Sequence, residues 1–413
     1  MNRKISLGVA LALALVLVAA SIPLTMVYAR REQNRILANL PARAGLFASV
    51  GELEDVIEQS ALERPNASLV APELVRGFVA GLGDSRARYL SPEEYALYLK
   101  RLSGETADLG FELTYTPPQG VLVTSVRGTA AAAGLRIGDI VTQMEADNRI
   151  IFNGEASGQE DIELLLRKLE SLGSGTGTTA AIPSINVTYE REKISHTSKI
   201  AFGDRVSTVY GSLLADGVGY VHVTALLKTT REQMREQIGK LIAQGANSLI
   251  LDVRGCAEGT VAFACDALDL FISKSDVLAT VAFREGRAPQ SYRSTGSPVV
   301  TLPANSIAIL LNHETDGASE LFAYSMRSFG AAMLIGSASA GNGNSQEAFS
   351  LKETGGAVLL TTGRVTPGDK NESWCGDGEN RGVLPDIAVG NPDLQQETAR
   401  QQLIAAAAAN MAG

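Results

Sequence analysis

A long uncharged apolar segment near the N-terminus constrains this chain more than any other feature. Arg3 and Lys4 precede residues 5–29, which include no charged residue, and Arg30 and Arg31 end the run. Residues in a helix rise about 1.5 Å each, so this run spans roughly 37 Å and exceeds the ~30 Å hydrocarbon core of a bilayer. We expect residues 1–30 to be a single membrane anchor, with the remaining chain outside the cytoplasm. The alternative is a signal peptide that is cleaved before secretion.

Composition narrows the range of partners. The chain has 413 residues, a net charge of −9 and 45% hydrophobic residues, so it has material for a large core and no basic excess for nucleic-acid phosphates. Its three cysteines form no CxxC pair and show no metal-ligand spacing with the three histidines. We therefore expect no metal, no cofactor and no nucleic acid. The cysteines form either one disulfide and a thiol, or three thiols.

Residues 31–104 are expected to form a helical segment. Val50, Leu53, Val56 and Ile57 recur at the spacing of a buried helical stripe. A further helix should begin after Ser91, because Pro92, Glu93 and Glu94 follow it as first-turn residues.

In residues 105–200, apolar residues recur at every second position instead of every third or fourth. This spacing predicts a small domain of strands with one helix. Phe111, Leu113 and Tyr115 alternate with polar residues, and Ile185 begins a similar alternation. Between them, residues 161–172 carry an amphipathic helical pattern.

Residues 201–395 alternate apolar strands with amphipathic helices, which is typical of an α/β layer architecture. Strands are expected at 218–223, 248–254, 277–283, 306–311 and 332–335, and helices at 230–244, 260–272 and 318–329. A C-terminal helix is expected over 396–413. The predicted fold class is therefore multi-domain α/β.

Several short motifs in this order are similar to those of one family. They are Gly83-Asp84-Ser85, Tyr89-Leu90-Ser91-Pro92-Glu93-Glu94-Tyr95, Leu109-Gly110-Phe111-Glu112-Leu113, Ala133-Gly134-Leu135 with Gly138-Asp139, Leu251-Asp252-Val253-Arg254, Arg364 with Thr366-Pro367, and Gly382-Val383-Leu384-Pro385-Asp386-Ile387. The chain resembles the C-terminal processing peptidases, or tail-specific proteases, over almost its whole length. The resemblance implies an inserted PDZ domain at 105–200 and an α/β ClpP/crotonase-like serine-peptidase core at 201–395.

The resemblance places a peptide-binding loop at Leu109, Gly110 and Phe111, with Leu113 on the following strand. Backbone N–H groups of a glycine-bearing loop can hold a terminal carboxylate, while an extended peptide adds to the sheet edge. The expected partners are polypeptide C-termini or extended peptide segments.

The chain departs from the family pattern at the catalytic pair. Active members use a serine nucleophile and a neutral lysine base about 25 residues apart. Alignment on Asn312 and on the run that ends at Glu320 places Gly317 at the serine position. Asn342 falls at the lysine position, 25 residues later (342 − 317), and Gln346, which orients the lysine in active members, is present. Glycine has no nucleophilic atom and an amide is no general base, so the pattern predicts loss of the serine–lysine mechanism.

The oxyanion positions also differ from the family pattern. The usual Gly-Gly becomes Glu258-Gly259, and Ala318 follows the nucleophile position. A carboxylate at Glu258 would oppose a developing negative charge. Ser319 is the fallback nucleophile, although the closeness of His313, Asp316 and Ser319 in sequence disfavours a triad; Asp316 is instead expected to cap the helix.

The sequence thus predicts a membrane-tethered, proteolytically inactive homologue of serine endopeptidases that binds peptides or proteins as a scaffold or regulator. Its partners would include a second copy or an active protease. The alternatives are an active endopeptidase with a displaced nucleophile and a structural envelope protein.

Overall fold

The computed structural model describes residues 48–63, 66–175, 182–203, 206–272, 276–368, 374 and 382–412. The chain divides into two compact units, Met1–Leu74 and Val75–Gly413. Within the described ranges, no helix combines the length and apolar character that crossing a membrane requires. The predicted anchor at residues 5–29 lies outside those ranges and stays a prediction.

The first unit has a helix at residues 48–60 and the beginning of α2 (Ala67–Ala80). The prediction that the apolar stripe of the first helix is buried was wrong, because Val50, Leu53 and Val56 are 37%, 54% and 54% exposed. The apolar spacing predicted the helix correctly, but burial also requires a packing partner.

The segment that follows α2 is partly extended. β1 (Arg88–Leu90), which was predicted to be helical, pairs instead with a distant strand of the second unit. Helix α3 (Pro92–Ser103) begins as predicted. The Ser91 hydroxyl accepts from the Glu94 N–H, and the Glu94 carboxylate accepts from the Ser91 N–H. This reciprocal capping box satisfies two backbone donors and fixes the start of the helix.

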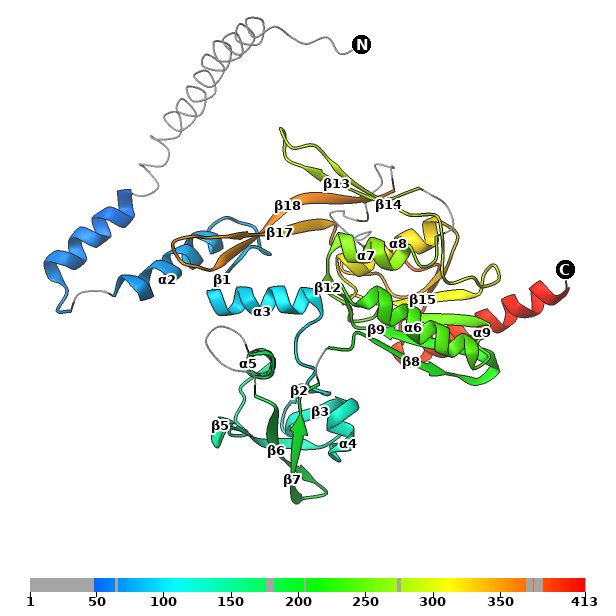
Figure 1. The fold of residues 1–413 in the computed structure, drawn as a ribbon, viewed down its shortest axis with the longest axis horizontal. Coiled ribbons are helices and arrows are strands. Elements are labelled where there is room, and N and C mark those ends of the chain that lie inside the picture. The colour runs from blue at the N-terminus through cyan, green and yellow to red at the C-terminus, as the bar shows by residue number, and fades with distance from the viewer. Residues whose placement is uncertain are drawn as a thin grey trace, which may run out of the picture. The chain divides into compact units, whose positions relative to one another are not determined.

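Residues 107–203 form a small domain around one antiparallel sheet in the order β2-β3-β4-β6-β7, with β5 paired to β4 (Figure 1). Its elements are β2 (Phe111–Thr116), β3 (Gly120–Val126), α4 (Gly128–Ala132), β4 (Ile140–Ala146), β5 (Arg149–Phe152), α5 (Gln159–Ser174), β6 (Ser184–Arg191) and β7 (Ile194–Ala201). The predicted alternation holds: Leu113 and Val187 are buried in one cluster with Ile162, Leu165 and Leu169 of α5.

Residues 206–412 form a large domain on a six-stranded sheet in the order β19-β16-β15-β11-β9-β8, in which only β8 is antiparallel to its neighbour. Its strands are β8 (Val209–Leu213), β9 (Val218–Val223), β11 (Ser248–Asp252), β15 (Ile307–Leu311), β16 (Met333–Gly336) and β19 (Ile387–Ala388). Its helices are α6 (Thr230–Ala243), α7 (Val261–Leu268), α8 (Ala318–Ser328) and α9 (Pro392–Ala412).

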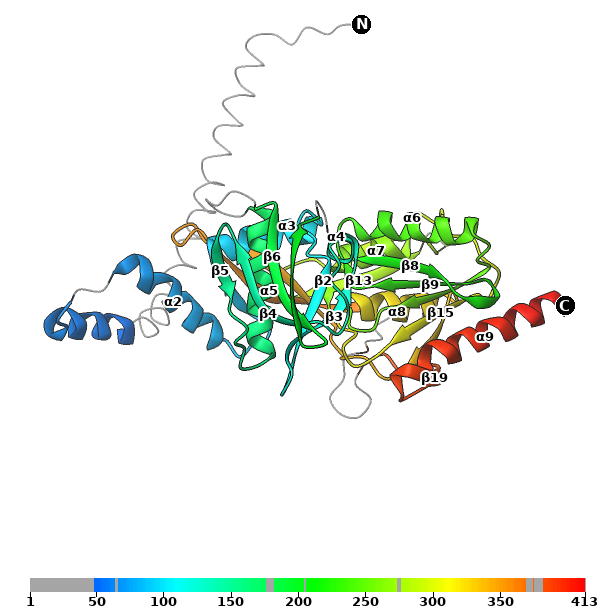
Figure 2. The ribbon, with the colours of Figure 1, turned by 90° about the horizontal axis from the view of Figure 1, so that it is seen from below.

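The central strands are buried on both faces because helices cover both sides. Leu249 and Leu251 pack in the core that holds α6, α7 and α8, whereas Ile250 packs with Ala399 and Leu403 of α9. Figure 2 shows α6 and α9 on opposite sides of the sheet. Successive side chains of β11 point to opposite faces of the sheet, and helices cover both faces. The strand therefore has apolar residues on both faces and no polar face.

A second, antiparallel sheet was not predicted. It has the order β1-β18-β13-β14 with β17 paired to β18, and it consists of β13 (Val277–Phe283), β14 (Gln290–Arg293), β17 (Asn344–Ser350), β18 (Ala357–Pro367) and β1. The short strands β10 (Ala225–Leu226) and β12 (Glu258–Gly259) pair in parallel.

Several predicted helix boundaries were wrong. Helix α5 spans Gln159–Ser174 rather than 161–172, and α6 and α8 each end one residue earlier than predicted. Helix α7 ends at Leu268 rather than 272. Helix α9 begins at Pro392 rather than 396, because the Asn391 carboxamide accepts from the Asp393 N–H and so caps the helix earlier.

Candidate functional site

The two positions predicted to replace the catalytic serine and lysine lie next to each other. Gly317 is the N-cap of α8, in the loop that follows β15, with a φ of 61°. Asn342 lies in the loop between β16 and β17 and is 8% exposed. A Cβ on Gly317 would lie 3.3 Å from Nδ2 of Asn342. The structure therefore brings together two positions that the sequence separates by 25 residues.

A buried carboxylate holds this juxtaposition in place. Glu320, in the first turn of α8, is fully buried, and its Oε2 accepts from the N–H groups of Gly317 at 2.9 Å and Asn342 at 2.7 Å. Its Oε1 accepts from the Gly341 N–H at 2.6 Å and from the Ser339 hydroxyl. Four donors thus satisfy the carboxylate and tie the start of α8 to the loop of Asn342.

A short polar chain occupies the space between the two loops. The Asn342 amide donates to Oδ1 of Asp316, and Arg86 Nη2 donates to Oδ2 of Asp316 at 3.1 Å. The prediction that Asp316 caps α8 was wrong, since Gly317 is the N-cap and Asp316 uses both carboxylate oxygens elsewhere. An amide donor, a carboxylate and a guanidinium offer hydrogen bonding here, but no neutral amine.

The segment before β1 contributes to the site through its backbone. Gln346 in β17 donates from Nε2 to the carbonyl oxygen of Arg86 at 2.9 Å. Asp84 accepts from the N–H groups of Thr361 at 3.0 Å and Arg86 at 3.1 Å. Burial alone would raise the pKa of Asp84, but these hydrogen bonds outweigh it and hold the pKa below the usual range.

The predicted oxyanion positions also lie together. A Cβ on Gly259 would lie 3.0 Å from the Ala318 Cβ and 2.8 Å from the Leu226 Cβ, so only glycine fits between β10 and α8. The Glu258 carboxylate is not isolated, because Arg101 Nε of α3 donates to it at 2.6 Å. The ion pair with Arg101 partly neutralises the carboxylate that was expected to oppose a developing negative charge at this position.

Arg101 links three parts of the second unit. Its Nη1 donates to Glu170 of α5 at 2.7 and 2.5 Å, while Nε binds Glu258 of β12. Burial would lower the pKa of Arg101, but the two carboxylates raise it above its usual range. Burial raises the pKa of Glu170, and Arg101 offsets only part of that shift. No local sequence pattern indicated Arg101, because its partners lie 69 and 157 residues away.

The fallback nucleophile Ser319 is engaged in backbone contacts. It is 1% exposed, and its hydroxyl donates to the carbonyl oxygen of Cys256 and lies 3.0 Å from that of Asp316. His313 is exposed in the preceding loop. The hydroxyl proton is therefore directed at a backbone carbonyl rather than at a general base.

The predicted peptide-binding loop borders a cavity. Leu109 and Phe111 line a cavity of about 340 Å³ with Leu166 of α5, and across it lie Thr224 and Glu258 of the large domain. Leu113 is 3% exposed and packs in the domain core instead. Two of the four predicted residues, Leu109 and Phe111, thus line this cavity, which we term the interdomain groove. Its full lining is Arg101, Ala107, Asp108, Leu109, Phe111, Glu112, Arg127, Glu163, Leu166, Arg167, Glu170, Val206, Ser207, Thr208, Thr224, Ala225, Leu227 and Glu258.

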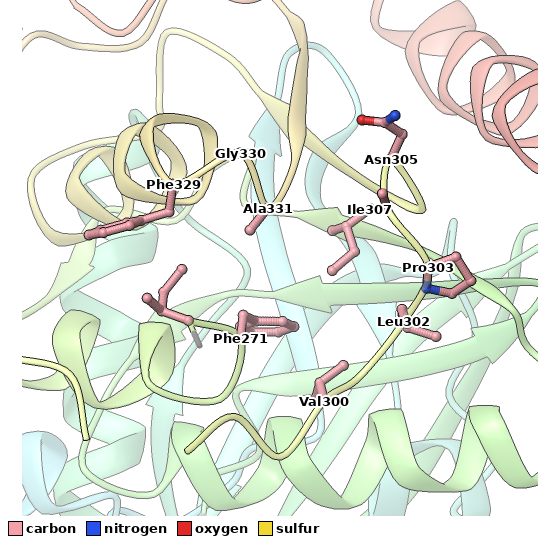
Figure 3. A pocket seen from close by; sticks show the side chains of 11 residues that line it. Phe271, Val300, Leu302, Pro303, Asn305, Ile307, Phe329, Gly330 and Ala331 are labelled. Carbon is pink, nitrogen blue, oxygen red and sulfur yellow. The ribbon is translucent and has the colours of Figure 1, made fainter. Parts of the chain in front are cut away.

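A second hollow of about 190 Å³ lies at the opposite end of β15 from Gly317. Phe271, Val300, Leu302 and Ile307 surround it with mostly apolar side chains (Figure 3). None of its lining residues is titratable. It therefore lacks the acids, bases and nucleophiles of a catalytic site.

The fold joins an α/β core to a small sheet domain, and Gly317 and Asn342 meet in two loops of that core. Residues 217–389 match the family described as Peptidase family S41. The chain therefore carries an S41 peptidase domain and is homologous to the C-terminal processing peptidases, as the motifs predicted.

Two curated relatives and one solved structure illustrate the similarity. The chain is 27% identical over 342 residues to the carboxyl-terminal-processing protease of Picosynechococcus sp., covering 81% of this chain and 77% of that protein. It is 21% identical over 348 residues to the carboxy-terminal processing protease CtpA of Bacillus subtilis, covering 84% and 70%. A putative S41 protease from Bacteroides fragilis shares the fold, with a TM-score of 0.50 and 16% identity over 86% of this chain and 95% of that chain.

Proposed function

We propose that this protein is a membrane-tethered, extracytoplasmic S41 homologue without peptidase activity that binds extended peptide segments or polypeptide C-termini. A scaffold of this kind would regulate an active protease or an assembly at the membrane, or act with a second copy of itself. The observation that carries the proposal is the 3.3 Å separation between a Gly317 Cβ and Asn342 Nδ2. The pair stands in the position of a nucleophile and base but offers neither.

The chemistry supports loss of activity rather than a reduced rate. Acyl transfer by this mechanism needs a hydroxyl to attack the carbonyl and a neutral amine to take its proton. Gly317 provides no side-chain atom, and the Asn342 amide donates its hydrogen to Asp316. Ser319 is the nearest hydroxyl on α8, but its proton binds the Cys256 carbonyl oxygen.

A peptidase assay tests this proposal. We expect no cleavage of an unfolded protein substrate and no labelling of the wild-type chain by a fluorophosphonate. The double variant Gly317→Ser, Asn342→Lys should gain weak labelling at the new serine, and the matched control Gly317→Ala, Asn342→Lys should not. Cleavage by wild type that disappears in Ser319→Ala would contradict the proposal and favour the displaced-nucleophile alternative.

Glu258 offers a further test of the oxyanion position. Loss of one oxyanion donor costs roughly a hundredfold or more in rate. Glu258→Gly added to the double variant should raise its activity if the carboxylate disturbs this region. Glu258→Gln is the size-matched control, because it removes the charge that Arg101 binds and keeps the side chain.

The proposed membrane topology rests on the apolar residues 5–29 and can be tested separately. We expect protease added to intact cells with a permeable wall to degrade residues 31–413. Protection in intact cells, with digestion only after lysis, would contradict the extracytoplasmic placement.

A further inference from the structure

The small domain and the large domain have separate hydrophobic cores. The buried apolar residues of 107–203 form one cluster, and those of the central sheet with α6, α7 and α8 form another. The interdomain groove of about 340 Å³ lies where the two domains meet. Two domains without a shared core are free to move unless their interface is large and apolar. Polar contacts across this boundary therefore matter for the position of the small domain.

Helix α3 is attached to the large domain and reaches the end of α5 in the small domain. The Lys228 N–H, in the loop before α6, donates to the Leu102 carbonyl oxygen at 3.1 Å. From the same turn of α3, Lys100 Nζ donates to the carbonyl oxygens of Ser174 at 2.6 Å and Gly175 at 2.9 Å. The last carbonyl groups of a helix lack partners within the helix, so this cation satisfies two of them.

Arg101, the next residue, lies between two carboxylates that belong to different domains. Its Nη1 donates to Glu170 of α5, and its Nε donates to Glu258 of β12 at 2.6 Å. The side chains of Glu170 and Glu258 are 12% and 31% exposed, so water screens their charges only in part. Burial raises the pKa of Glu170 and the charge of Glu258 raises it further, whereas Arg101 lowers it. Without Arg101, two like charges would face each other across the boundary.

We propose that Arg101 is a charge latch between the two domains, and that its loss lets Glu170 and Glu258 repel each other and move the small domain away from β12. This inference goes beyond the proposed function and does not depend on peptide binding. It gives the carboxylate of Glu258, which replaces the first glycine of the expected Gly-Gly, a role in docking the small domain.

Distance measurement by double electron–electron resonance on the full chain in detergent micelles tests the proposal. Spin labels at Ile150→Cys of β5 and Ile242→Cys of α6 report on the two domains, since these residues are 64% and 39% exposed. Cys375→Ser removes one native cysteine, and Cys256 and Cys265 are buried. We expect a single narrow distance distribution in the labelled parent. Arg101→Gln should add a second, longer distance, with the ratio of open to closed molecules raised on the order of tenfold or more.

Three further variants separate repulsion from general damage. Arg101→Gln combined with Glu170→Gln removes one of the two facing carboxylates, so it should return the distribution to that of the parent. Arg101→Lys keeps the positive charge and should keep most molecules closed. Arg167→Gln is the matched control, because Arg167 pairs with Glu163 of its own helix at 3.8 Å; its distribution should equal that of the parent.

Two results would overturn the inference. One is an Arg101→Gln distribution that equals that of the parent. The other is opening that persists when Glu170→Gln is added, because lost packing rather than repulsion would then be the cause. If Arg101→Gln does not fold, Glu170→Lys decides alone: it places a like charge against Arg101 and should open the domains, and an unchanged distribution in that variant rejects the latch.

Discussion

Substitution of Glu320 by Gln should destabilise the large domain, although it keeps the size of the side chain. The Glu320 carboxylate is fully buried and accepts from three backbone N–H groups and one hydroxyl. A glutamine amide has one oxygen for at most two of these donors. Its NH2 group must face the other pair, either the N–H groups of Gly317 and Asn342 or the N–H group of Gly341 and the hydroxyl of Ser339.

The expected loss follows from the donors left without an acceptor. Each buried donor without a partner costs about 1–3 kcal/mol, so two cost about 2–6 kcal/mol. Removal of a buried charge recovers part of this, because the carboxylate no longer pays its desolvation penalty. That penalty is already reduced by the N-terminus of α8, where Glu320 lies in the first turn. We therefore expect a net destabilisation of about 2–4 kcal/mol.

The chain provides its own reporter for this measurement. Trp374 is its single tryptophan; it is 5% exposed, and its ring centroid lies 5.8 Å from that of Tyr324 in α8. Urea unfolding followed by tryptophan fluorescence therefore reports on the large domain. Glu314→Gln, on an exposed residue of the same loop, is the control and should change the free energy of unfolding by less than about 0.5 kcal/mol. A Glu320→Gln curve that overlays wild type would refute the assigned role of the carboxylate.

Three further predictions concern single positions. Asp84→Asn should lower the melting temperature at pH 7. The folded-state pKa of Asp84 is lowered, so this carboxylate stabilises the fold above the ordinary pKa of about 4. The difference in melting temperature from wild type should vanish as the pH falls through the folded-state pKa. Gly336→Ala should abolish soluble expression, because Gly336 has a φ of 137° and a Cβ there would lie 2.1 Å from a backbone oxygen of β15. The control is Gly239→Ala in α6, whose Cβ would meet nothing within 4 Å and should be tolerated. Burial raises the pKa of Cys256 to about 12 and raises that of Cys265, and both are free thiols, so at pH 8 a maleimide should label at most one thiol in the native chain. After unfolding without reductant it should label all three; a single labelled thiol after unfolding would indicate a disulfide within the chain.

Sequence reasoning predicted the elements whose signals are local. The strands at 218–223 and 277–283 have the predicted bounds, and Ser91 caps α3 as its pattern indicated. These features depend on residues a few positions apart, so periodicity and capping chemistry suffice. The pairing of Gly317 with Asn342 was also predicted, because their spacing matches a family whose motifs flank both positions.

Glu320 had a readable signal that was not used. Its place three residues after Gly317 is that of the acid in a capping box, which predicts its bond to the Gly317 N–H. Its bonds to the Asn342 loop had no such signal, because that loop reaches the site through long-range contacts, among them the pairing of β15 with β16 and the bond from the Ala340 N–H to the Thr315 carbonyl oxygen.

The sequence by itself determined the type and order of most elements, the apolar faces of the central strands, and the identity of the residues at the catalytic positions. Only the tertiary structure decided which charges meet. Arg86 reaches Asp316 across 230 residues, and Arg101 reaches Glu258 across 157. It also decided that Val50 and Leu53 stay exposed while Leu249 and Ile250 are covered on opposite faces. The physical reason is the separation along the chain of the residues that interact. Backbone geometry and helix capping depend on residues a few positions apart, whereas the packing of distant segments decides which partner a charge or an apolar face meets.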